Sequence, residues 1–194
     1  MPHMTDCGLP GVKDIPYGVH MCNFYRDGNE LAAALVPYFA AGLRASERCI
    51  WITADPLPAA EAKARLAATG FDVEGAVASG ALVVRDHDDW YAEAGALKGN
   101  QVVDLWLEEE QRALAAGYAG LRITGNVTFL RAEEWELFME YESLVQRAFH
   151  GRRIVTLCTY DLGRCGAAEV LDVMRRHSCT LDRPDHGWQI LTPA

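Results

Sequence analysis

No stretch of the sequence approaches the roughly 20 consecutive apolar residues that a helix needs to cross a bilayer. The first 14 residues hold proline, glycine and aspartate at close intervals and lack the apolar core of a signal peptide. We therefore expect a cytoplasmic protein without membrane contacts. Residues 1–14 are expected to be a flexible segment that precedes a folded domain.

Clusters of positive charge are also missing. The chain has 18 Lys and Arg residues against 27 Asp and Glu residues, which gives a net charge of −9. Non-specific affinity for nucleic acid comes from clustered Lys and Arg side chains that neutralise phosphates. The sequence therefore predicts no direct contact with nucleic acid.

The common phosphate-binding and esterase motifs are absent. A P-loop has the pattern G-x-x-x-x-G-K-[ST], whose backbone N–H groups and lysine surround the phosphates. The corresponding residues 23–31 hold one glycine, no lysine, and the acids Asp27 and Glu30, which would repel phosphate. The G-x-G-x-x-G and G-x-S-x-G patterns are missing as well. We expect no bound nucleotide.

Cysteine pairs of the C-x-x-C type do not occur, which excludes a zinc ribbon and a thioredoxin-type motif. In a cytoplasmic protein, cysteines are more often free thiols or ligands than disulfides, and most are small buried residues. The six cysteines of the chain are Cys7, Cys22, Cys49, Cys158, Cys165 and Cys179.

The sequence does contain a regular alternation of strand-like and helix-like segments. Short apolar runs predict strands at residues 17–25, 49–53, 81–85, 121–124, 153–160 and 188–191. Apolar residues spaced by three or four predict helices at residues 29–45, 59–69, 101–116, 132–149 and 167–177, with Asn29 as the first N-cap. Such alternation forms βαβ units. Residues 15–194 are therefore predicted to be one three-layer α/β domain, with a mostly parallel central sheet and helices on both faces.

The first expected strand carries a histidine and a cysteine two positions apart. On a strand, His20, Cys22 and Phe24 share one face, and the first two lie about 7 Å apart. Cys158 could approach Cys22 if their strands are neighbours, and His20, Cys22 and Cys158 are then candidate ligands of zinc, copper or iron. Cys49 and residues 87–89 are further candidates. The remaining histidines, His3, His150, His177 and His186, are expected to be solvated or terminal.

The simpler alternative is that His20 is a hydrogen-bonded histidine and that Cys22 and Cys158 are buried thiols. Catalysis by a His20–Cys22 pair is not expected, because two side chains at this spacing are too far apart for a hydrogen bond. No carboxylate pair with a recognisable spacing was found either, so we expect no enzyme activity.

Aromatic and polar residues lie at or beyond the ends of the expected strands, where α/β proteins bind ligands. They predict a small, mostly apolar pocket with a few polar groups. For each aromatic residue, core packing is the alternative, and for the polar residues it is helix capping. The candidate ligand-binding residues are His20, Cys22, Phe24, Tyr25, Trp51, Asn126, Tyr160 and Asp161.

Several blocks, taken together and in order, resemble the MEDS domain, the methanogen/methylotroph sensory domain first described in a dichloromethane-responsive regulator. The resemblance covers residues 15–182. The blocks are Gly18-Val-His-Met-Cys-Asn-Phe-Tyr25, Glu30-Leu, Pro37-Tyr-Phe, Gly42-Leu, Glu47-Arg-Cys-Ile-Trp-Ile-Thr53, Gly120-Leu-Arg-Ile-Thr-Gly125, Glu140-Tyr-Glu142, Leu157-Cys-Thr-Tyr-Asp161 and Glu169-Val-Leu-Asp-Val-Met-Arg-Arg-His177.

This resemblance implies a RecA/KaiC-like fold with a degenerate P-loop. It also implies a sensory domain that detects a small organic ligand, a simple hydrocarbon derivative, and signals to a partner such as a histidine kinase or a transcription regulator. The metal-binding His and Cys suggested for the family fall on His20 and Cys22. Many members carry an acid where this chain has Asn126, and this neutral amide does not supply a carboxylate for a metal or a proton.

Two further possibilities remain open from the sequence. One is a non-catalytic interaction scaffold on a degenerate RecA-like ATPase fold. The other is a homodimer, since the apolar stripe of residues 101–116 serves equally for core or dimer contacts.

Overall fold

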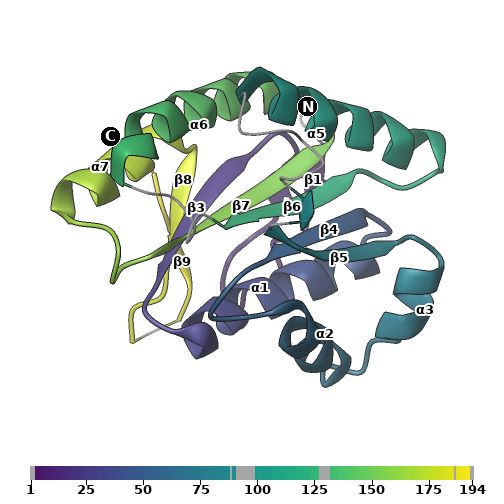
Figure 1. The fold of residues 1–194 in the computed structure, drawn as a ribbon. Helices are drawn as coiled ribbons and strands as arrows, with labels where there is room; N and C mark the ends of the chain where they lie inside the picture. Colours follow the sequence, from purple (N-terminus) through teal and green to yellow (C-terminus); the bar gives the residue numbers. More distant parts are fainter. Residues whose placement is uncertain (1–2, 88, 91–98, 127–131, 186, 193–194) are drawn as a thin grey trace.

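The computed structural model describes residues 3–87, 89–90, 99–126, 132–185 and 187–192. Its centre is a seven-stranded sheet in the order β5-β4-β6-β7-β3-β8-β9 (Figure 1). All neighbouring strands are parallel except β8 and β9. The strands are β3 (His20–Tyr25), β4 (Arg48–Thr53), β5 (Leu82–Asp86), β6 (Leu121–Asn126), β7 (Ile154–Asp161), β8 (Cys179–Asp182) and β9 (Gln189–Leu191).

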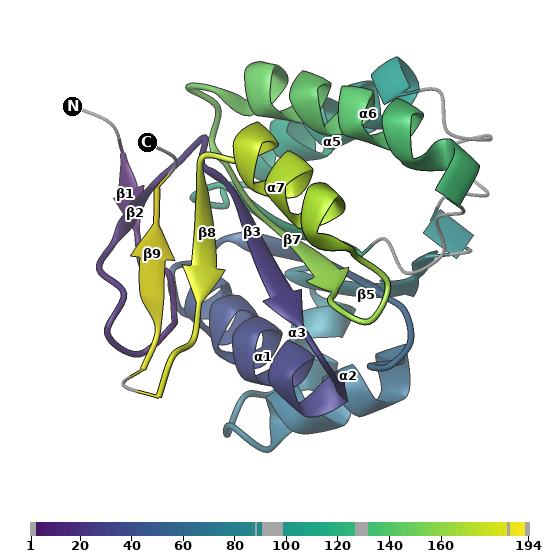
Figure 2. The ribbon, with the colours of Figure 1, turned by 90° about the vertical axis from the view of Figure 1, so that its left-hand side faces the viewer.

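Helices cover both faces of this sheet. Helices α1 (Gly28–Arg44), α2 (Ala59–Ala67) and α3 (Val73–Ala78) lie on one side, and α5, α6 and α7 lie on the other (Figures 1 and 2). The latter are α5 (Gly99–Ala115), α6 (Trp135–Phe149, after a short 3-10 turn at Ala132–Glu134) and α7 (Ala167–Arg176). The predicted three-layer, mostly parallel α/β architecture is therefore confirmed.

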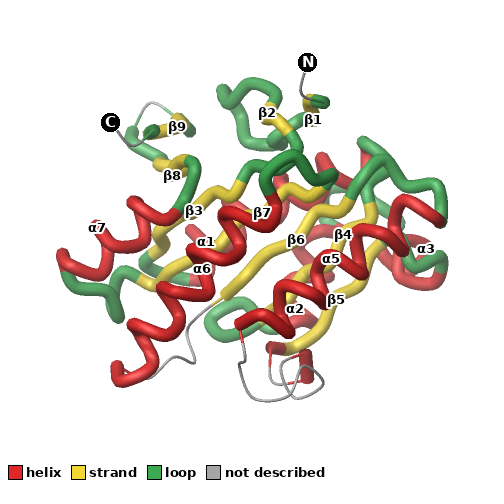
Figure 3. Tube along the Cα trace, turned by 90° about the horizontal axis from the view of Figure 1, so that it is seen from above, coloured by secondary structure: helices red, strands yellow, loops and turns green. Residues whose placement is uncertain are grey.

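The central strands are the continuous apolar segments of the sequence, because a parallel sheet under two helix layers has no solvated face. In β7, seven of the eight residues are buried, and in β4 five of six. Figure 3 shows α5 and α6 lying over the sheet. Alternate residues of each strand therefore face either α1–α3 or α5–α7.

The start of α1 differs in detail from the expectation. Asp27, not Asn29, is the N-cap, and its Oδ1 accepts hydrogen bonds from the backbone N–H groups of Asn29 and Glu30. An aspartate is stabilising there because it satisfies free N–H groups and lies at the positive end of the helix dipole.

The order of the strands shows that the predicted site residues do not all lie on neighbouring strands. The neighbours of β3 are β7 and β8, whereas β4 lies between β5 and β6. The strand that carries Cys49 and Trp51 is thus separated from β3 by two strands. The expected neighbourhood of β3 and β7 does occur, with Cys22 opposite Cys158 in the register.

The N-terminal segment is also packed more closely than expected. Residues Met4–Thr5 (β1) and Ile15–Pro16 (β2) form a small antiparallel sheet, and Cys7 and Leu9 are buried in the core on the α1 side. The Thr5 hydroxyl donates to Glu47, which forms a fully buried ion pair with Arg122. Thr5, Cys7 and Leu9 therefore pack against the domain that was expected to begin at residue 15.

Candidate metal centre

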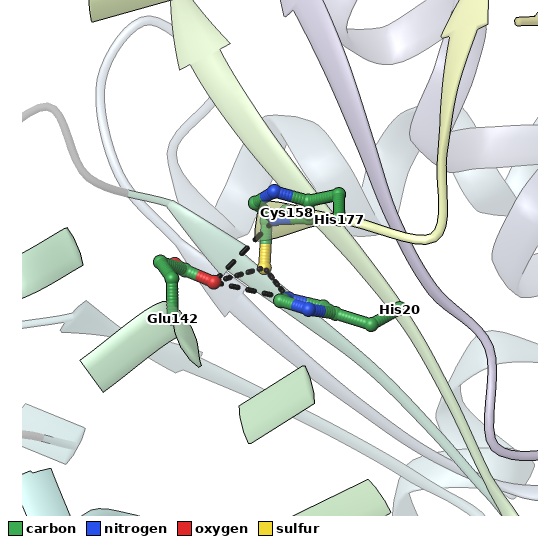
Figure 4. Close-up of side chains that lie close together, drawn as sticks. All are labelled: His20, Glu142, Cys158 and His177. Atoms are coloured by element: carbon green, nitrogen blue, oxygen red, sulfur yellow. Dashed lines mark hydrogen bonds and ion pairs between the residues drawn. The ribbon is translucent and has the colours of Figure 1, made fainter. Parts of the chain in front are cut away.

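Four buried side chains with metal-binding atoms converge between β3, β7, α6 and the end of α7. They are His20, Glu142, Cys158 and His177, and one donor atom from each lies within 4.8 Å of the others. Figure 4 shows the four side chains pointing toward one another. None of the four residues is more than 6% exposed.

Local structure explains how each side chain reaches this place. His20 on β3 and Cys158 on β7 lie on the faces of neighbouring parallel strands that are turned toward α6. Glu142 lies on the buried face of α6 together with Phe138, Met139 and Val145, which recur at helical spacing. His177 follows the last residue of α7 and enters the core from the turn before β8.

The hydrogen bonds of the two imidazoles leave one nitrogen of each facing the cluster. His177 Nδ1 lies 2.7 Å from the carbonyl oxygen of Val173, and His20 Nδ1 lies 3.2 Å from Oε1 of Gln146. Both oxygens are acceptors, so each Nδ1 is the protonated nitrogen of a neutral ring. Each Nε2 then presents a lone pair to the cluster.

The distances between these donor atoms are short. His20 Nε2 is 3.0 Å from Glu142 Oε2 and 3.3 Å from Cys158 Sγ. His177 Nε2 is 3.4 Å from the same Glu142 oxygen, and the two imidazole rings are 4.0 Å apart. The other oxygen of Glu142 accepts a hydrogen bond of 3.0 Å from the hydroxyl of Tyr160.

Burial governs the charge state of the cluster. It lowers the pKa of His20 to about 3, and burial together with the neighbouring His20 lowers the pKa of His177 to about 3. Burial also raises the pKa of Glu142, and burial with the adjacent Glu142 raises the pKa of Cys158 well above its usual value. With protein groups alone the site therefore favours neutral side chains, and a bound cation would favour the carboxylate and the thiolate instead.

The donor set fits a divalent transition metal. A tetrahedral site with bonds of about 2.0–2.3 Å places its ligand atoms roughly 3.3–3.7 Å apart. Four of the six separations lie near that range, from 3.0 Å between His20 and Glu142 to 3.9 Å between Cys158 and Glu142, and all six are within 4.8 Å. Metal-binding histidines usually donate their second N–H to a carbonyl, a carboxylate or water, as both histidines do here.

The structure brings together two of the three predicted metal ligands, His20 and Cys158. The third, Cys22, lies apart from the four-residue cluster. Its Sγ is 3.2 Å from Thr180 Oγ1 and 3.7 Å from the carbonyl oxygen of Cys179. Among the further candidates, Cys49 contacts backbone carbonyls on the α1 side of the sheet, and position 88 lies outside the described residues.

The expectation for His177 was wrong. It was predicted to be solvated, but it is buried and 3% exposed. Glu142 was missed, although the sequence offered a signal: it is an acid inside the apolar stripe of a helix, at a position where burial is costly without a partner.

The predicted ligand-binding residues lie on both faces of the sheet. Phe24 and Tyr160 share the face of the cluster, with ring centres 5.7 Å apart. Tyr25 and Trp51 belong to the core on the α1 side, where Trp51 stacks on Phe39. These residues therefore do not line one common pocket.

The two polar candidates lie at strand ends, as expected. Asn126 is the buried last residue of β6. Asp161 ends β7, and its carboxylate accepts a hydrogen bond from the backbone N–H of Gly163, which is a local turn contact.

Comparison with known proteins identifies the family. Residues 19–178 match MEDS, described as the MEthanogen/methylotroph, DcmR Sensory domain. The chain belongs to this family. It is also 28% identical over 181 residues to the transcriptional repressor DcmR of Methylorubrum extorquens. That match covers 88% of this chain and 62% of the repressor, so the chain spans less than two thirds of its relative.

Two solved structures share the fold. The KaiC-like protein PH0186 from Pyrococcus horikoshii matches with a TM-score of 0.60 and 13% identity, over 98% of this chain and 86% of that one. The flagellar accessory protein FlaH from Methanocaldococcus jannaschii matches with a TM-score of 0.58 and 9% identity, over 86% and 71% of the two chains. The fold is therefore RecA/KaiC-like, and the family gives the chain a sensory, regulatory role. Within the described residues, no helix has the length and apolarity that crossing a membrane requires.

Proposed function

We propose that this chain is a metal-dependent sensory domain for a small organic molecule, a simple hydrocarbon derivative. His20, Glu142, Cys158 and His177 hold one transition-metal ion. The observation that carries the proposal is the convergence of four buried donor atoms while both Nδ1 atoms are engaged elsewhere. Keeping an acid, a thiol and two imidazoles together in a core is costly unless they bind something.

The metal is zinc or iron in preference to copper(I). Thiolates alone favour soft ions such as copper(I), whereas imidazole and carboxylate ligands suit harder divalent ions. The bound ion would supply a Lewis-acidic centre that recognises a donor atom of the ligand. The protein holds the two imidazoles in position through Val173 and Gln146 and holds the carboxylate through Tyr160.

The signal would pass to a partner or output domain. A ligand shifts a conformational equilibrium only through different affinities for two states. The four donor residues belong to β3, α6, β7 and the turn after α7, so a change in coordination acts on four elements at once. The similarity to a longer transcriptional repressor supports a transcription regulator as the recipient. A histidine kinase is the other partner class that the family resemblance implies.

Metal analysis of protein purified without a polyhistidine tag tests the proposal. We expect one zinc or iron ion per chain in the native protein, and a large loss of metal in His20→Ala and His177→Ala. Cys22→Ser is the matched control, because Cys22 is a buried thiol on the same strand as His20 but outside the cluster. It should keep its metal.

Two results would contradict the proposal. One is a native protein that takes up no stoichiometric metal under reducing conditions, which would favour the interaction scaffold. The other is a Cys22→Ser variant that loses metal while His177→Ala retains it, which would restore the ligand set predicted from the sequence.

A further inference from the structure

A small cavity lies beside the donor cluster, between helices α5 and α6 and strands β6 and β7. Its volume is about 20 Å³. A cavity of about 10–15 Å³ is enough for one water molecule, so only a very small molecule fits here. Glu142 and Cys158 form part of the wall. The cavity and the proposed metal centre therefore share two residues.

The rest of the wall is mainly apolar. Trp106, Ile123, Phe138, Val145 and Phe149 line the cavity. Cavities with apolar walls tend to exclude water and to accept small apolar guests such as xenon. An apolar guest is therefore favoured over water across most of this surface.

A glycine keeps the space next to the sulfur open. Gly125 on β6 lies opposite Cys158 on β7 in the register, and both residues line the cavity. A Cβ atom added to Gly125 would lie 3.4 Å from Cys158 Sγ. Any larger side chain at position 125 would take up space between the cavity and the cluster.

One polar atom in the wall has no partner. Thr156 is 3% exposed and lines the cavity, and its hydroxyl oxygen makes no hydrogen bond to the described residues. A buried hydroxyl without a partner is costly, and a polar atom of a guest would satisfy it. This hydroxyl adds a polar group to the mainly apolar wall, two residues before Cys158 on the same strand.

We propose that this cavity, and not the pocket predicted at the strand ends, receives the molecule that the domain detects. The guest is a neutral compound of about one to three non-hydrogen atoms. Its apolar body contacts the aromatic and aliphatic wall. It carries one polarisable donor atom, such as sulfur, that lies between Thr156 and the edge formed by Cys158 and Glu142. The role of the donor atom rests on the proposed metal centre, whereas the cavity itself does not.

Dimethyl sulfide, dimethyl ether and xenon are suitable probes of the full chain. The first two have a similar bent shape and differ mainly in donor softness, and xenon has no donor atom. Binding is followed through the methyl NMR signals of Ile123 and Val145, and through the visible absorption of the cobalt(II)-substituted protein. We expect all three probes to shift the methyl signals. The sulfide should bind more tightly than the ether and alone change the cobalt spectrum strongly.

Two variants locate the binding. Gly125→Ala should weaken sulfide binding by about tenfold or more, the effect of one methyl group in an apolar pocket. Cys22→Ser is the control, because Cys22 is buried on a neighbouring strand but does not line the cavity. Val145→Leu, which fills the cavity from α6, should act like Gly125→Ala.

Each of the following outcomes contradicts one part of the proposal. If Gly125→Ala and Val145→Leu bind the probes as the native protein does, the cavity is not the site. If dimethyl ether and dimethyl sulfide bind with equal affinity, the proposed preference for a soft donor atom is contradicted. If no metal binds but xenon still shifts the native methyl signals and not those of Gly125→Ala, the cavity stands and the proposed function fails. If metal binds but no probe shifts the methyl signals, the proposed metal centre stands and the cavity is not the site.

Discussion

Gln146 touches the donor cluster without offering a ligand atom to it. Its Oε1 lies 3.2 Å from His20 Nδ1, and its amide also contacts the hydroxyl of Ser178 at 3.1 Å. These contacts fix which nitrogen of His20 carries the proton and how the ring is turned. At the scale of single residues, Gln146 is therefore a positioning residue for the proposed metal centre.

Replacing Gln146 by Leu should lower zinc affinity about 10- to 100-fold, the usual effect of losing such a hydrogen bond to a metal ligand. Competition with a fluorescent chelator measures the affinity. Ser143→Ala on the same helix is the control, since among the described residues the Ser143 hydroxyl bonds the Met139 carbonyl within its own helix and no atom of the cluster. An unchanged affinity in Gln146→Leu would show that His20 is not oriented by this contact or is not a ligand.

At the scale of elements, the start of α1 differs from a P-loop. The N-terminal N–H groups of this helix, which would face a phosphate in a P-loop, already bind the Asp27 carboxylate. Arg26 is engaged by Glu30 of the same helix. A Cβ on Gly28 would lie 2.8 Å from the carbonyl oxygen of Pro56, so the β3–α1 connection is also closely packed.

We therefore expect millimolar Mg-ATP to leave the thermal unfolding midpoint of the protein unchanged. A ligand that binds only the folded state raises its stability by mass action, so a binding nucleotide would be visible in this measurement. Differential scanning fluorimetry with Mg-ATP, and with Mg-AMP as the control, is sufficient. A rise of several degrees with ATP alone would mean that the fold binds nucleotide without the usual loop.

Helix α7 depends more on the donor cluster than the other long helices do. Only Val173 of α7 is buried, whereas ten residues of α1 are. His177, directly after α7, is one of the four proposed ligands. In the whole molecule, the metal would therefore fasten α7 and the following β8 to the sheet.

Chelation of the metal should increase amide hydrogen exchange in α7 and β8 by tenfold or more, and leave α1 nearly unchanged. The reason is that local opening costs least where few buried contacts hold an element. Exchange measured by mass spectrometry, with and without a chelator, tests this at peptide resolution. A uniform increase along the chain would indicate global destabilisation, and no change would mean that α7 is held without the metal.

The sequence by itself determined the class of fold. Apolar runs such as residues 49–53 and 153–160, separated by amphipathic segments, allow little besides a parallel sheet under two helix layers, because such strands must be buried on both faces. It also showed that the P-loop pattern is missing, since that pattern consists of particular residue types at fixed local spacing. His20 could be singled out because its spacing from Cys22 on the same strand is also a local pattern.

Only the tertiary structure decided which residues join His20. The order of strands places Cys158 beside β3 and Trp51 two strands away, and no local pattern encodes that order. His177 follows a helix with a single buried residue, and Glu142 lies among apolar residues of another helix. Their meeting therefore depends on how α6 and α7 pack on the sheet. A binding site made from four separate elements is a property of long-range packing, whereas secondary structure and local motifs follow from neighbouring residues.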